Sequence, residues 1–253
     1  MSMFSDLKEA LVPEFRALWK KAFGDDDVFL DSFFSTAFAP HRGRCILEEG
    51  RVRAVLYWFD VSCEDRKLAY VYAVATAPDY RGRGLCRALV EDTKEILKTR
   101  GYDGILLVPQ EENLIRLYEK LGFSPCTEVS EFVCGPQIPA VPLHKVDASD
   151  YALRRRALLP QGGVIQEDEN LAFLQTQAEF CIGPGFAAAI NTDGDKLHCM
   201  ELVGDPGAAP GIVMALGCTS GFFRCPGKGK PFSMLYPLTA NCPAPTYFGL
   251  AFD

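Results

Sequence analysis

Three arginines and two glycines lie close together in one stretch of the chain, at Arg81, Gly82, Arg83, Gly84 and Arg87. Glycine permits tight backbone turns, and the start of a helix presents unpaired N–H groups with a partial positive charge. Arginine side chains add charge-assisted hydrogen bonds to an anion. Because the stretch follows an apolar strand-like run and precedes a helical pattern, it predicts a site for a phosphate or diphosphate group.

The loop differs from two common phosphate-binding motifs. Neither G-x-x-x-x-G-K-[ST] nor G-x-G-x-x-G occurs at this position. A solvated turn that carries incidental arginines is the alternative interpretation. The loop alone therefore indicates an anion site without identifying the anion.

Strand and helix patterns alternate on both sides of this loop. Apolar spacing predicts helices over 6–22 and 24–38, and then a hairpin over 44–61 that turns at a Glu-Gly pair. Residues 66–76 are apolar on both faces, which is typical of a central strand. After the loop we expect a helix over 85–100, a strand over 102–108, a helix over 111–121 and a strand over 126–135.

Prolines 136, 139 and 142 indicate an extended connector. We therefore expect a first domain over 1–135, a linker over 136–144 and a smaller α+β domain over 145–253. In the latter, the pattern predicts helices over 148–159 and 169–180, a hairpin over 186–204 and strands over 230–238 and 246–253. Residues 67–90 and 196–217 share a Lys-Leu strand start, a Pro/Gly loop and an apolar helix, which indicates a duplicated unit that has lost its arginines.

Composition limits the classes of protein that fit. The 253 residues carry a formal net charge of −7, which argues against a general nucleic-acid binder. We expect a cytoplasmic protein without a membrane partner, since no export signal and no membrane-length apolar run occurs. The ten cysteines contain no Cys-x-x-Cys pair, and the three histidines are isolated, so neither a disulfide framework nor a metal site is expected.

Two motifs together resemble the GNAT superfamily of acyl-CoA N-acyltransferases. "RGRGLC" at 81–86 is similar to the loop [RQ]-x-x-G-x-[GA], and "YEKLGF" at 118–123 is similar to the later motif. Cys86 departs from the usual Gly or Ala, and Glu111 replaces a common asparagine, although Asn113 is near. The resemblance covers residues 4–135, and the aromatic-rich front and second half also resemble Eis-type acetyltransferases.

This resemblance implies a fold, a donor and roles for individual residues. The fold is an α+β, α/β/α-layered architecture in which a mixed central sheet contains a splayed strand pair, with a second, smaller GNAT-like domain. Acetyl-CoA would be the cosubstrate, without a metal. Its pantetheine arm would pair with Val74, Ala75 and Thr76. Its diphosphate would bind the segment Arg81, Gly82, Arg83, Gly84, Leu85 and Cys86, with Asn113 nearby.

The chemistry implied is attack of a neutral amine on the thioester. Tyr118 matches the tyrosine that protonates the leaving thiolate, although it could simply pack in the core. The base stays open, because residues 66–76 carry no carboxylate. A water chain is one candidate, and the C-terminal residue Asp253 is another, since Eis-type enzymes use their terminal carboxylate.

Three functions are compatible with these features. The first is an N-acetyltransferase that transfers acetyl from acetyl-CoA to a primary amine in a ternary complex. The second is an inactive acyl-CoA-binding sensor or assembly subunit, and the third is a binder of another nucleotide or phosphate. The expected acceptor is a small-molecule or peptide amine, and the acidic composition favours a cationic one. No nucleic-acid partner is expected, and homo-oligomerisation stays open.

Overall fold

The computed structural model describes residues 3–252, which form two compact units. The first unit runs to Val61 and includes Asp65–Ser124 and Leu235–Pro243. The second contains Ser62–Glu64, Pro125–Met234 and the chain from Ala244 onward. The units thus exchange at several points along the chain, Ser124 among them, and the single boundary expected at 135 stays a prediction. The strands β6 (Ser124–Cys134) and β12 (Lys230–Pro237) contribute residues to both units, which a proline-rich segment does not reveal.

The first unit is built on a mixed sheet. Its strands are ordered β1-β2-β3-β4-β5, and the end of β12 lies beside β5. Strand β1 pairs antiparallel with β2, and β2 pairs antiparallel with β3, whereas β4 and β5 are parallel. The strand bounds are Met3–Asp6, Gly43–Glu48, Arg51–Cys63, Arg66–Thr76 and Gly104–Leu107.

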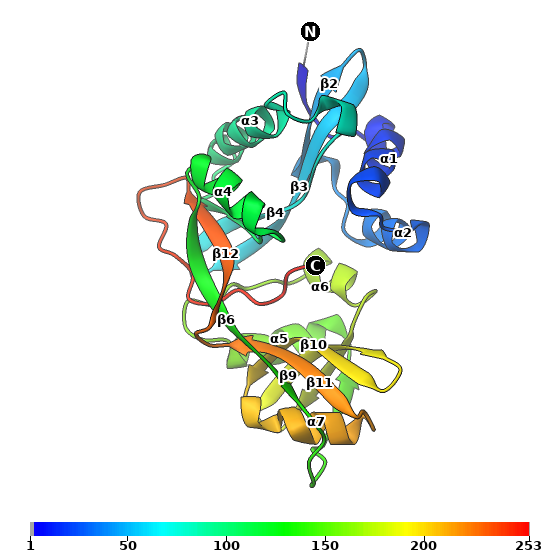
Figure 1. The fold of residues 1–253 in the computed structure, drawn as a ribbon. Coiled ribbons are helices and arrows are strands. Elements are labelled where there is room, and N and C mark those ends of the chain that lie inside the picture. Colours follow the sequence, from blue (N-terminus) through cyan, green and yellow to red (C-terminus); the bar gives the residue numbers. More distant parts are fainter. Residues whose placement is uncertain (1–2, 253) are drawn as a thin grey trace. The chain divides into compact units, whose positions relative to one another are not determined.

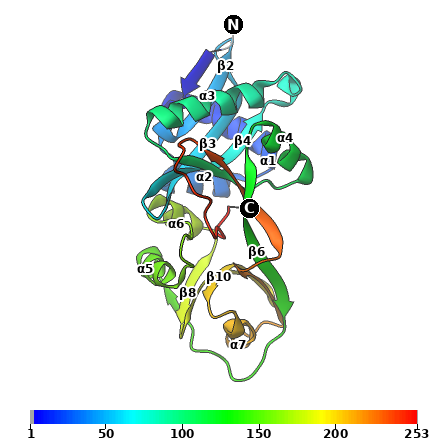
Figure 2. The same cartoon turned by 90° about the vertical axis from the view of Figure 1, so that its left-hand side faces the viewer.

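Helices cover both faces of this sheet (Figure 1). Helices α1 (Val12–Phe23) and α2 (Asp27–Thr36) lie on one side, and α3 (Leu85–Thr99) and α4 (Glu112–Lys120) lie on the other. Figure 2 shows α3 in front of the strands of this unit. The unit therefore has three layers, as the resemblance implies.

Aromatic side chains fill the layer between α1, α2 and the sheet. Trp19 and Phe33 are buried, and their ring centroids lie 4.7 Å apart. Tyr57 packs edge-on against Phe33 at 5.0 Å. Asp26 fixes the start of α2, because its carboxylate accepts the Phe29 N–H at 2.8 Å, a cap that stabilises a helix by about 1 kcal/mol. This aromatic layer packs α1 and α2 against the sheet.

The parallel pairing of β4 with β5 covers only the first part of β4, because β5 ends at Leu107. Their register runs from Leu68 opposite Gly104 to Tyr70 opposite Leu106, and β4 then continues to Thr76. Within this separated part, Ala73 has a φ of 53°, a left-handed value that an L-residue rarely adopts. Strand β4 therefore extends beyond its pairing with β5, as the splayed pair implied by the resemblance requires, and a backbone irregularity lies in this extension.

The second unit has a sheet ordered β12-β6-β11-β10-β9-β8-β7. The strands that follow β6 are β7 (His144–Val146), β8 (Glu179–Gly183), β9 (Phe186–Asp193), β10 (Lys196–Gly204) and β11 (Ser220–Pro226). Helix α5 (Ala148–Leu158) packs on β8 and β9, and α7 (Ala209–Ala215) packs on β11. The short helix α6 (Glu169–Leu174) follows α5.

The second unit repeats the order of elements around the predicted loop. Strand β10 leads through a short turn into α7 and then into β11, as β4 leads through a loop into α3 and β5. Strands β10 and β11 are parallel, and their pairing ends at Cys199 opposite Phe223, although β10 continues to Gly204. The pattern shared by residues 67–90 and 196–217 therefore corresponds to a repeated strand–loop–helix–strand arrangement.

Three expectations about individual elements were wrong. The first helix begins at Val12, after β1 at residues 3–6 and a short 3-10 helix at Glu9–Leu11. Helix α6 ends at Leu174 and β8 begins at Glu179, so the helix expected over 169–180 is divided. Residues 247–252 form no strand and make only a bridge from Tyr247 to Gly163. Asp253 lies outside the described residues.

None of the helices described over residues 3–252 combines the length and the apolar character needed to cross a membrane.

Candidate functional site

The loop between β4 and α3 leaves a row of backbone donors open. Gly82 and Gly84 have φ values of 75° and 78°, which favour glycine, and Gly84 is the N-cap of α3 without any side-chain cap. Among the backbone hydrogen bonds outside helices and strands in residues 3–252, none is donated by the N–H groups of 82–84, and no side-chain cap covers the first N–H groups of α3. A Cβ added at either glycine would meet nothing within 4 Å. The start of α3 therefore faces open space that can admit an anion.

Arginine side chains surround these donors. Arg81 donates from Nε to the Thr76 carbonyl at 3.3 Å, which holds it beside the end of β4. The Arg83 guanidinium lies against the Tyr80 ring, 4.5 Å from its centroid. Arg81, Arg83 and Arg87 are exposed, and none of them pairs with a carboxylate of the described chain. The loop is thus a local positive site in an acidic protein.

Val74, Ala75 and Thr76 lie on the part of β4 that has separated from β5. Ala75 is buried, whereas Val74 and Thr76 are half-buried. Backbone groups at a parted strand edge need another partner, and an extended ligand can supply one. The structure therefore brings the expected strand residues next to the expected loop.

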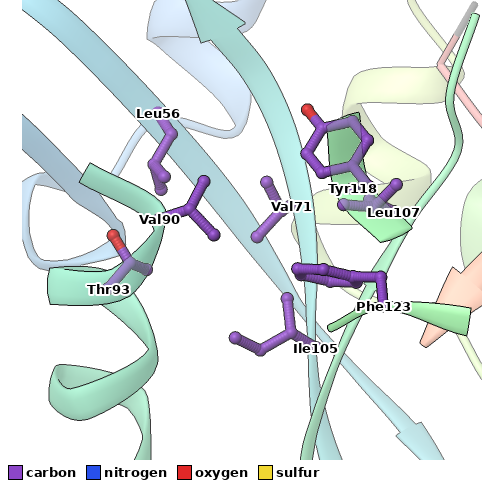
Figure 3. Close-up of a pocket in the computed structure, with 8 residues that line it drawn as sticks. All are labelled: Leu56, Val71, Val90, Thr93, Ile105, Leu107, Tyr118 and Phe123. Atoms are coloured by element: carbon purple, nitrogen blue, oxygen red, sulfur yellow. The ribbon is translucent and has the colours of Figure 1, made fainter. Parts of the chain in front are cut away.

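An apolar hollow lies between the sheet and helices α3 and α4 (Figure 3). Val71 and Leu107, which line it, come directly after the last paired residues of β4 and β5. The hollow is therefore located where the two strands begin to separate. Its lining residues are Leu56, Val71, Val90, Thr93, Ile105, Leu107, Tyr118 and Phe123.

Tyr118 closes one end of this hollow. Its ring packs against Phe123 with centroids 5.6 Å apart, and its hydroxyl points away from Phe123 (Figure 3). Burial raises the pKa of the Tyr118 phenol above its ordinary value, and the nearby Cys86 thiol raises it further. The side chain is only 6% exposed and stays protonated at neutral pH. It is therefore suited to donate a proton.

Cys86 occupies the first turn of α3 and is half-buried. Burial raises the pKa of its thiol, so the thiol stays protonated at neutral pH. A buried neutral thiol is a poor nucleophile. Cys86 thus acts as a small apolar side chain in the position where the GNAT motif has Gly or Ala.

Two candidates are not brought into this arrangement. Asn113 lies in the first turn of α4 and is exposed, and within residues 3–252 no hydrogen bond joins its side chain to the loop. Asp253 lies outside the described residues, so its role as a base stays a prediction. Over residues 3–252, no group of three or more His, Cys, Asp and Glu side chains is arranged to hold a metal ion.

The sequence did not point to the residues that support the loop. Arg53 of β3 lies against the Tyr80 ring, and Tyr80 was not assigned a role although it is next to Arg81. The positive φ of Ala73 was also not expected. Contacts between β3 and the loop depend on strand pairing, which residue spacing does not show.

The matching turn of the second unit lacks such a site. Asp205 directs its carboxylate to the Gly207 N–H at 2.8 Å, and the loop carries no arginine. Helix α7 also has a proline in its first turn, which removes a donor. An acidic cap repels a phosphate where the first unit would attract it. The repeated half therefore keeps the parted strands without the anion-binding loop.

Comparison with known proteins finds relatives for the first half of the chain. Residues 4–126 match the model of the acetyltransferase (GNAT) domain, which is just under half of the chain. A curated relative, the mycothiol acetyltransferase of Beutenbergia cavernae, is 33% identical over an alignment that covers 35% of this chain and 38% of that protein. The chain therefore spans less than half of that relative's length.

Solved structures extend the likeness in fold to almost the whole chain. A GCN5-related N-acetyltransferase from Kribbella flavida gives a TM-score of 0.74 at 16% identity, covering 94% of this chain and 72% of that one. Eis1 from Mycobacterium abscessus gives 0.69 at 11% identity, covering 94% and 74%. A tandem GNAT protein from the clavulanic acid biosynthesis pathway gives 0.57 at 11% identity, covering 96% and 100%. The chain thus has a GNAT fold with a second GNAT-like half.

Proposed function

We propose that this protein is an N-acetyltransferase that moves an acetyl group from acetyl-CoA to a primary amine in a ternary complex. The parted strands β4 and β5 are the observation that carries the proposal, because β4 leads directly to the open, positively charged start of α3. The residues present fit a diphosphate attached to an extended arm. Acetyl-CoA supplies the thioester that an amine can attack.

Each part of the site has one task in this reaction. The N–H groups of Gly82 to Cys86 bind the diphosphate, and Arg81 and Arg83 add charge. Val74, Ala75 and Thr76 pair with the amides of the pantetheine arm and so orient the thioester. The amine nitrogen bonds to the acetyl carbon as the carbon–sulfur bond breaks. Tyr118 gives its phenolic proton to the departing thiolate, and the amine loses a proton to a base.

The base is the least supported role. Strand β4 carries no carboxylate, so a water chain or a carboxylate from another segment must accept the amine proton. This absence favours a second candidate, an acyl-CoA-binding protein without transfer activity. The acceptor is proposed to be a small-molecule or peptide amine, and the net charge of −7 favours a cationic one.

Release of free CoA thiol from acetyl-CoA in the presence of an amine panel tests the proposal. We expect thiol release that depends on at least one amine and exceeds the rate without amine. Binding of acetyl-CoA without amine-dependent release would support the non-catalytic candidate. A thermal-shift comparison of acetyl-CoA, CoA, NAD and ATP then separates both from a binder of another nucleotide, because only CoA species should stabilise the protein.

Replacing the loop arginines should weaken binding of acetyl-CoA. Each of Arg81→Gln and Arg83→Gln removes a cation next to the diphosphate, so we expect a Kd about tenfold higher per substitution and a weaker dependence of binding on salt. Isothermal titration calorimetry measures both. Arg87→Gln is the matched control, since it removes the same charge from an exposed position in the first turn of α3, outside the glycine-rich loop, and should change Kd about threefold or less. An equal effect at all three positions would mean that only net charge matters.

A further inference from the structure

Helix α4 carries Tyr118 but buries little else that could hold it in place. Of its nine residues, Tyr118 alone is buried. A helix this short is not stable by itself, so its position depends on contacts with the rest of the unit. The turn that follows is bound to it, because the Leu121 and Phe123 N–H groups both donate to the Tyr118 carbonyl at 3.0 Å. Whatever holds this turn therefore also holds Tyr118.

Lys94 of α3 holds this turn. Its Nζ donates to the Leu121 carbonyl at 2.6 Å, and Leu121 is the C-cap of α4. Carbonyl groups at the end of a helix lack partners within the helix and carry partial negative charge, which an ammonium group satisfies. The Lys94 side chain is only 4% exposed, whereas its carboxylate partner Glu91, 3.0 Å away, is 54% exposed. The buried polar contact of Lys94 is therefore the one with the end of α4.

Two aromatic rings enclose the Lys94 ammonium. Its Nζ lies 3.9 Å from the centroid of the Tyr236 ring and 5.6 Å from that of Phe123. Cations are attracted to the faces of such rings, most strongly where water is excluded. The Tyr236 ring, from β12, packs on Phe123 at 5.4 Å, and Phe123 packs on Tyr118 at 5.6 Å. Continuous contacts thus lead from Lys94 and Tyr236 to the Tyr118 ring.

A lysine so completely buried is uncommon, because its ammonium loses water as a hydrogen-bond partner. An apolar side chain could fill the space beside the two rings without this cost, but it would leave the Leu121 carbonyl without a donor. The link to α4 therefore explains why Lys94 occupies this position. Misplacing a catalytic group by about 1 Å can lower a rate about 100-fold, so such a link affects turnover.

We propose that Lys94, enclosed by Tyr236 and Phe123, is a positioning residue that fixes the Tyr118 hydroxyl for proton transfer to the departing thiolate. The inference rests on the proposed function and adds Lys94 and Tyr236, which lie outside both sequence motifs. Lys94 binds the end of α4 to the middle of α3, whereas Tyr118 lies near Cys86 in the first turn of α3, about 12 Å away along that helix. Two contacts this far apart fix the direction of α4 as well as its position.

Lys94→Met keeps most of the side chain and removes the hydrogen-bond donor. We expect kcat to fall about 10- to 30-fold, because the Tyr118 hydroxyl is no longer held in place. The Kd of acetyl-CoA should stay within about twofold of the wild-type value, since the start of α3 is unchanged. Lys98→Met is the matched control, because it removes an exposed lysine one turn later in α3 and should change neither quantity.

A second comparison separates positioning of Tyr118 from a general structural role. In the Tyr118→Phe background the hydroxyl is already absent, so adding Lys94→Met should lower kcat by less than about twofold. A merely structural role would instead lower kcat by the same factor in both backgrounds. Tyr236→Leu removes the ring on the other side of the ammonium from a half-buried position, and it should show the same dependence on the Tyr118 hydroxyl.

NMR of the free protein gives a measurement that does not depend on turnover. With ¹³C at the ζ carbon of tyrosine, the Tyr118 resonance is identified by its loss in Tyr118→Phe. It should shift in Lys94→Met and Tyr236→Leu and stay in place in Lys98→Met, and thermal unfolding confirms that each variant is folded. Equal factors in the two backgrounds, or an unchanged Tyr118 resonance, would overturn this inference alone. Absence of amine-dependent thiol release from the wild-type protein would overturn the proposed function, and this inference with it.

Discussion

Tyr118→Phe is expected to lower kcat about 100- to 1000-fold and to leave the Kd of acetyl-CoA nearly unchanged. The substitution removes only the phenolic oxygen, while the ring can keep its packing against Phe123 in the hollow. Because burial raises the pKa of the phenol, the group is in its proton-donating form at neutral pH. Steady-state kinetics with a saturating amine, together with calorimetry of acetyl-CoA, measure the two quantities separately.

Tyr102→Phe is the matched control for this experiment. Tyr102 is another buried tyrosine of the first unit, but its hydroxyl contacts Asp60 and accepts a hydrogen bond from Trp58 at 3.2 Å. Loss of the Tyr102 hydroxyl should lower thermal stability and leave turnover of the folded protein unchanged. Equal turnover in Tyr118→Phe and the wild-type protein would remove Tyr118 from the mechanism and leave it as a packing residue.

Glu201→Gln is expected to destabilise the second unit by about 3–5 kcal/mol. The Glu201 carboxylate is fully buried and accepts hydrogen bonds from Arg155 Nε at 2.6 Å and Nη2 at 2.9 Å. Burial alone would lower the pKa of Arg155, but the Glu201 carboxylate outweighs it and raises that pKa. The variant leaves a buried guanidinium without its counter-ion. Chemical denaturation measures the lost free energy of unfolding.

A double substitution tests whether the stability is lost because one charge is left without its partner or because any change in this core is destabilising. Arg155→Met with Glu201→Leu removes both charges, so most of the lost stability should return. Glu179→Gln is the surface control, because it breaks the exposed pair with Lys145 in the same unit and should change stability by less than about 1 kcal/mol. If the double variant instead lost the sum of the free energies of unfolding lost by Arg155→Met and by Glu201→Leu alone, Arg155 and Glu201 would stabilise the core independently of each other.

The sequence predicted the parts of the fold that local patterns control. Strand β4 occupies residues 66–76 as expected, and α3 extends from Leu85 to Thr99, one residue short of the expected end. Alternating and helical apolar spacing are direct consequences of burying one face, so these elements can be read from residues alone. The loop glycines were also informative, since Gly82 and Gly84 both adopt the positive φ that glycine favours.

The C-terminal segment shows where such patterns fail. Residues 247–252 are buried and apolar, which is typical of a strand, yet they are held by scattered contacts. The Tyr247 carbonyl accepts the Val164 N–H at 2.8 Å, and the Leu250 carbonyl accepts from Gln166 Nε2 at 2.7 Å. A buried extended segment and a strand have the same composition. Only the position of the neighbouring segments of the same chain distinguishes the two.

Long-range partners were equally inaccessible from the sequence. Arg155 and Glu201 are 46 residues apart, and nothing in the spacing of charges indicates that they pair inside the core. Arg53 approaches Tyr80 only because β3 and β4 run side by side, with the Ala77 N–H bonded to the Arg53 carbonyl. Residue types thus predicted the anion-binding loop, whereas the supporting residues depend on the pairing of strands.

A crystal structure of the protein with CoA tests the central claim most directly. The account predicts diphosphate oxygens within about 2.7–3.2 Å of the N–H groups of Gly82 to Cys86. It also predicts that the pantetheine amides pair with Val74 to Thr76 and that the sulfur lies near the Tyr118 hydroxyl. CoA bound at another place, with the start of α3 empty and the parted edge of β4 unoccupied, would contradict it.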